Sequence, residues 1–210
     1  MDKNPVHIIS HPLVKHKLTL MRKKNTNSGE FRLLLYEISQ FLAYEISRNL
    51  PLVDEDIQTP LAKSKQPLLD NVKIAFISIL RSGNGILEGM LDVMPFAHVG
   101  HIGLYREPST HTAVEYYFKL PSDMPERDAV IIDPMLATGR TAAIAATRVK
   151  ETGAKTLKFI CLLASPEGIA YFHEKHPDVE IITVSVDEKL NNKKYILPGL
   201  GDVSHRMFGT

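Results

Sequence analysis

The sequence has little of several features that would narrow its class. It has no tryptophan and a single cysteine, Cys161, so no intrachain disulfide can form. Its 25 Lys and Arg balance 24 Asp and Glu, which leaves no field of one sign to attract nucleic acid or an anionic membrane. No apolar run approaches membrane-spanning length, and the first residues resemble no secretory signal. We therefore expect a cytoplasmic protein with no nucleic-acid or membrane partner and with a buried, unreactive thiol.

Apolar strands alternate with helical segments over most of the chain. Runs typical of strands buried in a parallel sheet occupy residues 73–80, 99–105, 129–132, 156–164 and 179–186. Helices are expected at residues 30–49, 86–94, 141–150 and 167–176. This rhythm predicts one domain over residues 1–210, with an α/β, doubly wound, mostly parallel sheet flanked by helices and ligands at the carboxyl ends of the strands. Residues 51–70 are polar and read as irregular, and residues 107–113 read as a mobile polar stretch.

The most informative segment is the run Asp133-Pro134-Met135-Leu136-Ala137-Thr138-Gly139-Arg140-Thr141, which joins an apolar strand to an alanine-rich helix. Such a loop directs backbone N–H groups and the positive end of a helix dipole at one place. Gly139 allows a turn that a side chain would obstruct, and Thr138 and Thr141 add hydroxyl groups. Asp133 adds a carboxylate at the strand end. The combination suits a sugar phosphate, although an ordinary strand–helix turn would have a similar composition.

Spacing excludes the familiar nucleotide loops. A Walker A loop needs glycine where Pro134 stands, and Gly89 comes one residue too late to complete a dinucleotide fingerprint with Gly83 and Gly85. Arg81 and Arg106 each follow a predicted strand, so both are expected to reach the same crevice as the loop. Two guanidinium groups there would indicate a second phosphate group, such as a diphosphate, although either arginine alone could be a solvated surface residue.

Seven segments, in order, resemble the uracil phosphoribosyltransferase family of type I phosphoribosyltransferases. They are residues 11–17, 79–83, 105–106, 133–139, 165–168, 195–202 and 208–210. The resemblance implies that uracil reacts with 5-phosphoribosyl 1-diphosphate to give uridine monophosphate and diphosphate, with Mg²⁺ bound to the diphosphate of the donor. It also implies a hood built from the N- and C-terminal segments and a homodimer or homotetramer, and it leaves GTP open as an effector.

The resemblance assigns roles to individual residues. The phosphoribosyl donor would be bound by Arg81, Arg106, Asp133, Pro134, Met135, Leu136, Ala137, Thr138, Gly139, Arg140, Thr141 and Asp202. Uracil would be bound by Ile196, Gly201, Asp202 and Val203. Arg106, Asp133 and Asp202 would be the catalytic residues, with Asp133 accepting hydrogen bonds from the ribose hydroxyls and both arginines holding the diphosphate.

The chain departs from the family at several of these places. Arg140 stands where the uracil enzymes usually have glycine, Ser82 where they have alanine, and Val203-Ser204-His205 where they have Ala-Gly-Asp. The run Thr-Gly-Arg-Thr resembles the loop of RNA-binding attenuator proteins that sense uridine nucleotides. Those relatives carry paired aspartates and a basic face, and this chain has neither. A third alternative is a low-activity relative with altered base specificity.

Other conspicuous residues are given structural interpretations. His173 and His176, three residues apart, are expected on a solvated helix face without a metal. The basic block at residues 15–24 is expected to form a solvated N-terminal arm packed at a subunit interface. Tyr116, Tyr117 and Phe118 are expected in the core or at an interface.

Overall fold

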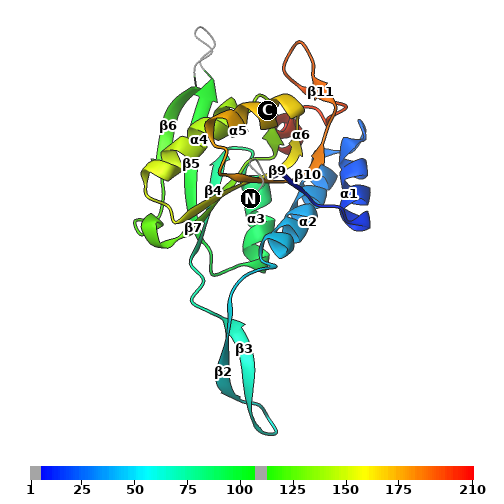
Figure 1. The fold of residues 1–210 in the computed structure, drawn as a ribbon. Helices are drawn as coiled ribbons and strands as arrows, with labels where there is room; N and C mark the ends of the chain where they lie inside the picture. The colour runs from blue at the N-terminus through cyan, green and yellow to red at the C-terminus, as the bar shows by residue number, and fades with distance from the viewer. Residues whose placement is uncertain (1–5, 107–112) are drawn as a thin grey trace.

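The computed structural model describes residues 6–106 and 113–210, in which strands and helices alternate (Figure 1). The strands are β1 (Val6–Ile8), β2 (Leu52–Gln58), β3 (Lys63–Leu69), β4 (Ile74–Leu80), β5 (His98–Arg106), β6 (Ala113–Lys119), β7 (Asp128–Ile132), β8 (Met135–Leu136), β9 (Thr156–Ala164), β10 (Glu180–Val186), β11 (Lys189–Leu190) and β12 (Ile196–Leu197). The helices are α1 (Pro12–Arg22), α2 (Ser28–Ile46), α3 (Asn84–Val93), α4 (Arg140–Glu151), α5 (Pro166–Lys175), α6 (Val203–Phe208) and the 3₁₀ helix η1 (Met124–Glu126).

The central sheet has eight strands in the order β1-β10-β9-β7-β4-β5-β6, with the short β8 beside β9. Its pairings are parallel apart from β5 with β6, which is antiparallel. Because the parallel strands share one direction, the loops that follow β4, β7, β9 and β10 all meet at the carboxyl edge. The predicted doubly wound, mostly parallel sheet is confirmed.

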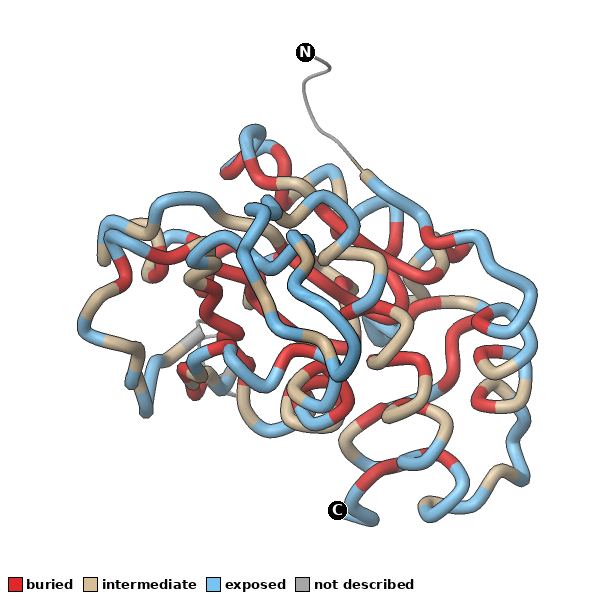
Figure 2. The backbone as a smooth tube through the Cα atoms, turned by 90° about the horizontal axis from the view of Figure 1, so that it is seen from below, coloured by how far each residue is buried: buried red, intermediate tan, exposed pale blue. Residues whose placement is uncertain are grey.

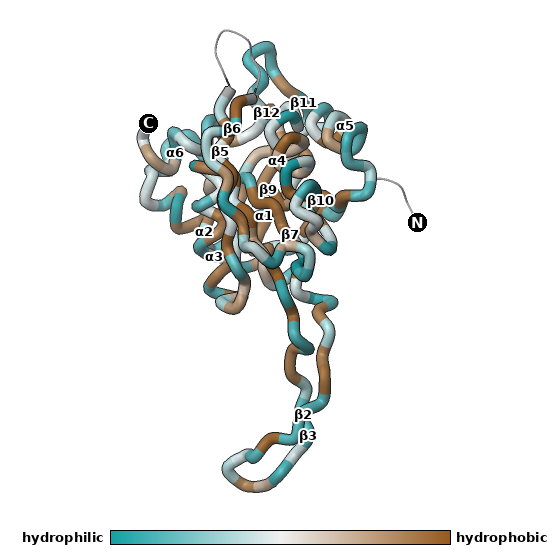
Figure 3. The backbone as a smooth tube through the Cα atoms, turned by 90° about the vertical axis from the view of Figure 1, so that its left-hand side faces the viewer, coloured by the Kyte–Doolittle hydropathy of each residue, from teal (hydrophilic) through white to brown (hydrophobic). Residues whose placement is uncertain are grey.

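Successive residues of the central strands pack on opposite faces of this sheet. In β7, Val130 and Ile132 join a hydrophobic cluster with α1, α2, α3 and α6, whereas Ala129 and Ile131 join another with α4 and α5. This alternation follows from the two-residue period of a strand. Buried residues therefore run through the middle of the molecule (Figure 2), and the apolar strands lie between the helical layers (Figure 3).

Residues 51–70 are ordered into a hairpin, so the expectation of an irregular segment was wrong. Strands β2 and β3 pair antiparallel, with Leu52 opposite Leu69, and project away from the sheet (Figure 1). Thr59 closes the turn, since its hydroxyl accepts hydrogen bonds from the backbone N–H groups of Leu61 and Ala62. The ribbon has solvent on both faces, so its sequence carries no alternation of apolar and polar residues for a pattern to detect.

His173 of α5 and His176, the residue that follows this helix, are buried, which contradicts the expected solvated face. His173 is 5% exposed and His176 is 6% exposed. Nε2 of His173 lies 3.1 Å from the carbonyl oxygen of Val179, and Nε2 of His176 lies 2.9 Å from that of Ala143 in α4. Burial lowers the pKa of both imidazoles, so their neutral forms are favoured. They join α5 to its neighbours through hydrogen bonds.

Other expectations have mixed outcomes. Cys161 is fully buried, and burial raises its pKa to about 12, as an unreactive thiol requires. Tyr116 and Tyr117 are about half exposed and so are not core residues of the chain, whereas Phe118 packs against one of the core clusters.

The basic block forms much of α1. Residues 107–112, expected to be mobile, lie outside the described residues. Over the described ranges, no helix is long and apolar enough to cross a membrane.

Candidate active site

The loop after β7 passes within backbone contact of the start of α5. Gly139 has a φ of 75°, and a Cβ there would lie 2.5 Å from the carbonyl oxygen of Gly168. A Cβ at Gly168 would in turn lie 2.4 Å from the carbonyl oxygens of Leu136 and Ala137. The close approach, together with the left-handed conformation at Gly139, confirms the prediction that a side chain would obstruct this turn.

Ser165 fixes the path of the same loop. Its hydroxyl donates to the carbonyl oxygen of Ala137 at 2.6 Å and accepts from the N–H of Gly168 at 2.9 Å. Its own N–H donates to the carbonyl oxygen of Leu136 at 3.0 Å. Ser165 thus caps α5 and holds the loop before α4 in one arrangement. Thr141 and Ala142, in the first turn of α4, line a cavity beside this loop, and the N–H groups of a first helical turn have no partner within the helix.

The loop borders a cavity of about 230 Å³, which we call the loop hollow. It is lined by Asp133, Met135, Leu136, Ala137, Thr138, Gly139, Thr141, Ala142, Lys193, Lys194 and Tyr195. Backbone N–H groups at a helix start, threonine hydroxyls and two lysines suit an anionic group such as a phosphate. The loop singled out from the sequence therefore lines a cavity, and whether a phosphate binds there stays a prediction.

A second cavity of about 220 Å³, the tail hollow, adjoins the first. It is lined by Ser82, Asp133, Met135, Ala137, Lys194, Tyr195, Ile196, Gly201, Asp202, Val203 and Ser204. Residues common to both linings are Asp133, Met135, Ala137, Lys194 and Tyr195. All four residues expected to contact uracil line the tail hollow. Asp133 lies where the two cavities meet, so one elongated ligand could occupy both.

The environment of Asp133 favours its neutral form. Burial raises the pKa of its carboxyl group to about 7, while hydrogen bonds from Ser82 and from the backbone of Met135 act in the opposite direction. The hydroxyl of Ser82 donates to Oδ1 of Asp133 at 3.2 Å. A displaced pKa at the junction of two cavities is typical of a functional carboxylate.

The chain around the tail hollow is held in shape by glycines and by a helix cap. Gly199 has a φ of 60°, and a Cβ there would lie 2.1 Å from the carbonyl oxygen of Ile196. Gly201 has a φ of 80°. Asp202 caps α6, because its Oδ1 accepts from the N–H of His205 at 2.8 Å. One carboxylate oxygen of Asp202 is therefore already engaged within the chain.

An ion pair from the other end of the sequence fixes this segment. The guanidinium of Arg22, at the end of α1, donates to both carboxylate oxygens of Asp187 at 2.6 and 2.7 Å and to the carbonyl oxygen of Gly199 at 2.7 Å. Asp187 also accepts from the N–H of Gly199 and from the hydroxyl of Ser185, each at 2.9 Å. Burial raises the pKa of Asp187, but these hydrogen bonds outweigh it and leave the pKa below its ordinary value.

A second arginine joins the same parts of the chain. Arg206 of α6 donates to the carbonyl oxygens of Leu200 at 3.0 Å and Lys23 at 2.8 Å, and also to that of Met21. The N-terminal helix and the C-terminal segment are therefore linked around the tail hollow. Arg22, Asp187 and Arg206 were not singled out from the sequence, because arginines and carboxylates so far apart in the chain leave no local pattern.

Three arginines expected at the donor site have different outcomes. Arg81 lines neither hollow: its guanidinium lies 5.8 Å from the Phe208 ring and donates to the Thr210 hydroxyl at 3.4 Å. Arg140 is exposed, and its guanidinium lies 5.8 Å from the ring of Tyr171, outside the lining of the loop hollow. The backbone of Arg106 ends β5, but its side chain lies outside the described part of the structure.

The turn between β11 and β12 contributes residues that sequence reasoning missed. Lys193 and Lys194 line the loop hollow, and Lys194 and Tyr195 line both cavities. Lys194 has a φ of 65°, a left-handed conformation that costs a residue with a Cβ roughly 1–2 kcal/mol. Asn191 and Asn192 were an available turn signal, but nothing local indicated that the turn would reach the loop after β7.

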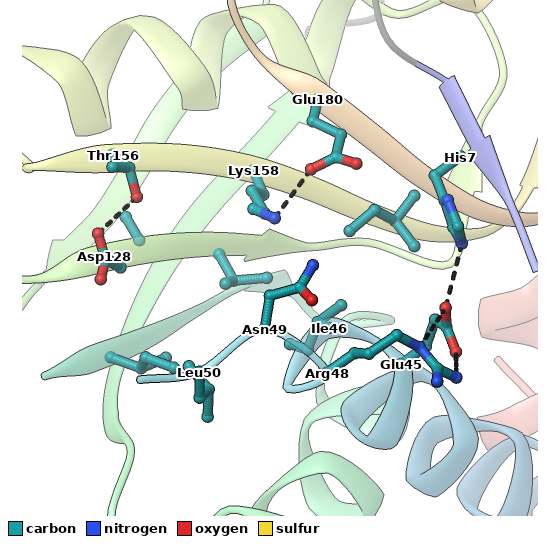
Figure 4. Close-up of a pocket in the computed structure, with 14 residues that line it drawn as sticks. His7, Glu45, Ile46, Arg48, Asn49, Leu50, Asp128, Thr156, Lys158 and Glu180 are labelled. Atoms are coloured by element: carbon teal, nitrogen blue, oxygen red, sulfur yellow. Dashed lines mark hydrogen bonds and ion pairs between the residues drawn. The ribbon is translucent and has the colours of Figure 1, made fainter. Parts of the chain in front are cut away.

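Another cavity, of about 350 Å³, lies at the opposite edge of the sheet (Figure 4). It is bordered by the starts of β4, β7 and β9, and most of its charged residues pair with one another. Lys158 pairs with Glu180 at 2.8 Å, and Glu45 pairs with Arg48 at 2.7 Å and His7 at 3.4 Å. Ligands of sheets wound in this way bind at the carboxyl edge, so the two hollows there are the better candidates.

Comparisons with known proteins agree with this geometry. The sequence model of the family described as uracil phosphoribosyltransferase matches residues 8–210. The chain is similar to the uracil phosphoribosyltransferase of Legionella pneumophila, with 55% identity over 210 residues that cover all of this chain and 98% of that protein. It is equally similar to that of Acidovorax ebreus, with 55% identity over 205 residues and 98% of each chain covered.

A solved structure is also similar over nearly its whole length. The AQ2163 protein from Aquifex aeolicus superposes with a TM-score of 0.91 at 36% identity, covering 98% of each chain. The family match, the relatives and the paired hollows at the carboxyl edge of the sheet lead to the same result: this chain belongs to the uracil phosphoribosyltransferase family.

Proposed function

We propose that the loop hollow and the tail hollow together bind the two substrates of uracil phosphoribosyltransferase, the activity that family membership gives this chain. The reaction converts uracil and 5-phosphoribosyl 1-diphosphate into uridine monophosphate and diphosphate. The observation that carries this placement is that Asp133 borders both cavities. A ribose ring at Asp133 would have its 5-phosphate in the loop hollow and uracil at its anomeric carbon in the tail hollow.

The charged residues at this edge of the sheet suit cleavage of the bond between the anomeric carbon and the diphosphate. Loss of diphosphate from the anomeric carbon leaves a cation-like sugar while negative charge builds up on the leaving group. Arg81 and Arg106 come directly after β4 and at the end of β5, at the same edge as Asp133, and their charge would favour that departure. In this proposal the guanidinium of Arg81 turns from Phe208 toward the diphosphate when the donor binds, and Arg106 contacts the same group from the end of β5. The Asp133 carboxylate, once deprotonated, accepts hydrogen bonds from the ribose hydroxyls.

Mg²⁺ fits this site together with the donor and not as a separate protein cage. No group of three or more His, Cys, Asp or Glu that could hold a metal occurs among residues 6–106 and 113–210. Mg²⁺ is commonly held by one or two carboxylates together with phosphate oxygens, and in this proposal Asp133 would supply one carboxylate. When bound, the ion would supply positive charge to the leaving diphosphate.

Base recognition in the tail hollow would depend mainly on the backbone. Uracil presents acceptor, donor and acceptor at O2, N3–H and O4, and a peptide chain can answer with N–H, C=O and N–H groups. Ile196, Gly201, Asp202 and Val203 lie in the turn-rich segment that lines this cavity. Cytosine would set an amino donor against a backbone donor, which costs about 1–3 kcal/mol for an unmet buried group. We therefore expect uracil to be used and cytosine and purines to be rejected.

Family membership leaves three further expectations. The exposed hairpin β2–β3 supports a homodimer or homotetramer, since an isolated two-stranded ribbon is marginally stable without a partner. A buried lone cysteine is consistent with a cytoplasmic location. Activation by GTP follows from the resemblance alone and would be tested by adding GTP to the assay. Nothing in the structure favours the RNA-binding alternative.

A direct assay tests the proposal. The protein is incubated with Mg²⁺ or EDTA, the phosphoribosyl donor and uracil, cytosine, hypoxanthine or adenine in turn, and nucleotide is separated from base. Uridine monophosphate should form with an equal amount of diphosphate, only with uracil and only in the presence of Mg²⁺. Efficient nucleotide formation from a purine would contradict the base assignment, and turnover in EDTA would contradict the role of the metal.

A further inference from the structure

The turn between β11 and β12 holds two lysines at a fixed place beside the loop hollow. Oδ1 of Asn191 accepts from the N–H groups of Lys193 at 2.9 Å and Tyr195 at 3.0 Å. The backbone of Asn191 also exchanges hydrogen bonds with that of Lys194 and Tyr195, each at 2.9 Å. The turn is therefore closed by its own hydrogen bonds, and the two lysines enter the lining of the cavity from a defined backbone.

Lys194 keeps a conformation that glycine would adopt more easily. Among the described residues other than glycine, Asn71 and Lys194 have a positive φ, 41° and 65°. Asparagine is one of the residues that tolerate this region, whereas lysine gains nothing from it locally. Backbone conformations of this kind are concentrated at functional sites, where the surrounding structure imposes them.

The charges of the two lysines are not neutralised by an ion pair with a described residue. Within residues 6–106 and 113–210, neither lysine lies within 4.0 Å of a carboxylate oxygen in an ion pair. Lys194 has a small electrostatic effect on Glu167. The pKa of Glu167 is lowered mainly by the hydrogen bond from the N–H of Leu190 and least by Lys194. That N–H lies 3.0 Å from Oε1 of Glu167, so the carboxylate already has a partner.

Arg140, which departs from the family pattern within the loop itself, does not supply this charge. Its guanidinium lies 5.8 Å from the ring of Tyr171, on α5, and Arg140 is not part of the lining of the loop hollow. The backbone N–H groups of the loop carry only partial charges. Among the described residues that line this cavity, those with a cationic side chain are Lys193 and Lys194.

We propose that Lys193 and Lys194 bind the 5-phosphate of the phosphoribosyl donor and of uridine monophosphate across the loop hollow. Lys194, which lines both cavities, would hold this group together with the backbone N–H groups at the start of α4. The inference rests on the placement of the phosphate under the proposed function. It adds side-chain cations from a different part of the chain to a site built from backbone N–H groups.

Lys194→Gly is the sharpest test, because it removes the charge while relieving the left-handed backbone. Lys193→Ala is made beside it, and dissociation constants for uridine monophosphate and for uridine are measured by calorimetry. Each variant should bind the nucleotide at least fivefold more weakly at low salt, with uridine binding unchanged. The loss should shrink in 0.5 M salt, because the lysines are exposed and their attraction is screened. The KM for the donor should rise while the KM for uracil stays constant.

Matched variants separate charge from fold. Lys189→Ala removes an exposed lysine of the same hairpin that lines neither hollow, and Asn71→Gly relieves the other positive φ far from the site. Both should bind uridine monophosphate like the parent. Thr141→Glu puts a carboxylate inside the loop hollow, at a helix start that tolerates an acidic residue, and should abolish nucleotide binding.

The outcomes distinguish the two proposals. If Thr141→Glu loses uridine monophosphate while both lysine variants bind it like the parent, the phosphate lies in the loop hollow but the lysines do not hold it. Loss of affinity in Arg140→Ala alone would likewise overturn the assignment to the lysines. If Thr141→Glu also binds the nucleotide normally, the placement of the phosphate itself is wrong.

Discussion

Burial raises the pKa of Asp133 to about 7, so near neutral pH its carboxyl group is divided between the charged and neutral forms. The ordinary value is 3.8, and an unfolded chain would therefore release this proton first. Between about pH 4 and pH 7 the folded protein holds more protons, and its free energy of unfolding decreases as the pH rises. The residue thus opposes folding at the pH at which its charge is useful.

Asp133→Asn should lower turnover at least tenfold while raising the melting temperature at pH 8. An amide cannot ionise, so the cost of burying the charge disappears together with the charge-assisted hydrogen bonds to ribose. The gain in melting temperature over the parent should vanish toward pH 4. Thermal unfolding at both pH values, with steady-state kinetics at pH 8, checks this. Activity close to that of the parent would show that Asp133 does not contact the sugar.

Arg22→Met should weaken uracil binding although Arg22 lines neither hollow. The change leaves the buried Asp187 carboxylate without its partner, which should cost about 3 kcal/mol of stability. It also frees the backbone of Gly199, so the KM for uracil should rise more than fivefold, with a smaller change for the donor. Arg22→Lys should recover only part of the stability and of the uracil binding, because lysine cannot donate to both carboxylate oxygens as the planar guanidinium does.

A matched control is available at the other edge of the sheet. Arg127 is buried and donates to both oxygens of Asp123 at 2.7 Å. Arg127→Met should lower stability without changing the KM for uracil. Equal effects of the Arg22 and Arg127 variants on that KM would reduce the Arg22–Asp187 pair to a general structural role.

At the scale of elements, α5 is the helix whose packing should respond to pH. Burial lowers the pKa of His173 and His176 from the ordinary 6.5, so the unfolded chain takes up protons first as the solution is acidified. Below about pH 6.5 the unfolded state binds more protons, and the free energy of unfolding falls with the pH. The loss of stability should affect the contact between His176 and α4, the helix that follows the phosphate loop.

His176→Gln should reduce this sensitivity to acid, because glutamine keeps an N–H donor near the carbonyl oxygen of Ala143 but does not ionise. The drop in melting temperature between pH 7.5 and pH 5.5 should be smaller than in the parent. His16→Gln, on the exposed side of α1, serves as the control and should leave the drop unchanged. An identical drop in all three proteins would show that His176 does not titrate in this range.

The sequence predicted the elements that form the core, but it did not predict which polar residues would be buried by contacts between distant segments. The strand ending at Ile132 was read correctly because both of its faces are buried, which leaves an uninterrupted apolar run. His173 and His176 were placed in solvent because a polar residue carries no sign of the neighbour that will cover it. The loop at Gly139 was recognised from its own residues, whereas Lys193 lines the site, and Arg22 supports it, only through contacts between distant segments.

At the scale of the whole molecule, hairpin β2–β3 is the feature that a single chain leaves unexplained (Figure 3). Leu52 and Leu69 face each other across the ribbon and are 62% and 43% exposed, and Leu61 at its tip is 95% exposed. Large exposed apolar side chains of this kind are typical of a surface that binds another protein chain, so we expect the hairpin to contact a second copy.

The double variant Leu52→Lys/Leu69→Lys should sediment as a smaller species than the parent. Charged residues on the ribbon would oppose burial against a second copy. Leu33→Lys, at a residue of α2 that is 58% exposed, is the control and should sediment like the parent. Sedimentation velocity at several concentrations measures this. An unchanged mass would show that the hairpin does not join the subunits.

The buried cysteine has a practical consequence for measuring contacts between subunits by spectroscopy. Because Cys161 is the sole cysteine, is inaccessible and keeps its proton, the protein offers a silent background to maleimide dyes and nitroxide spin labels. A cysteine introduced at Leu61 would then be the one position that reacts. Two labelled chains in one assembly could report the distance between their hairpin tips without any change to the native residues of the core.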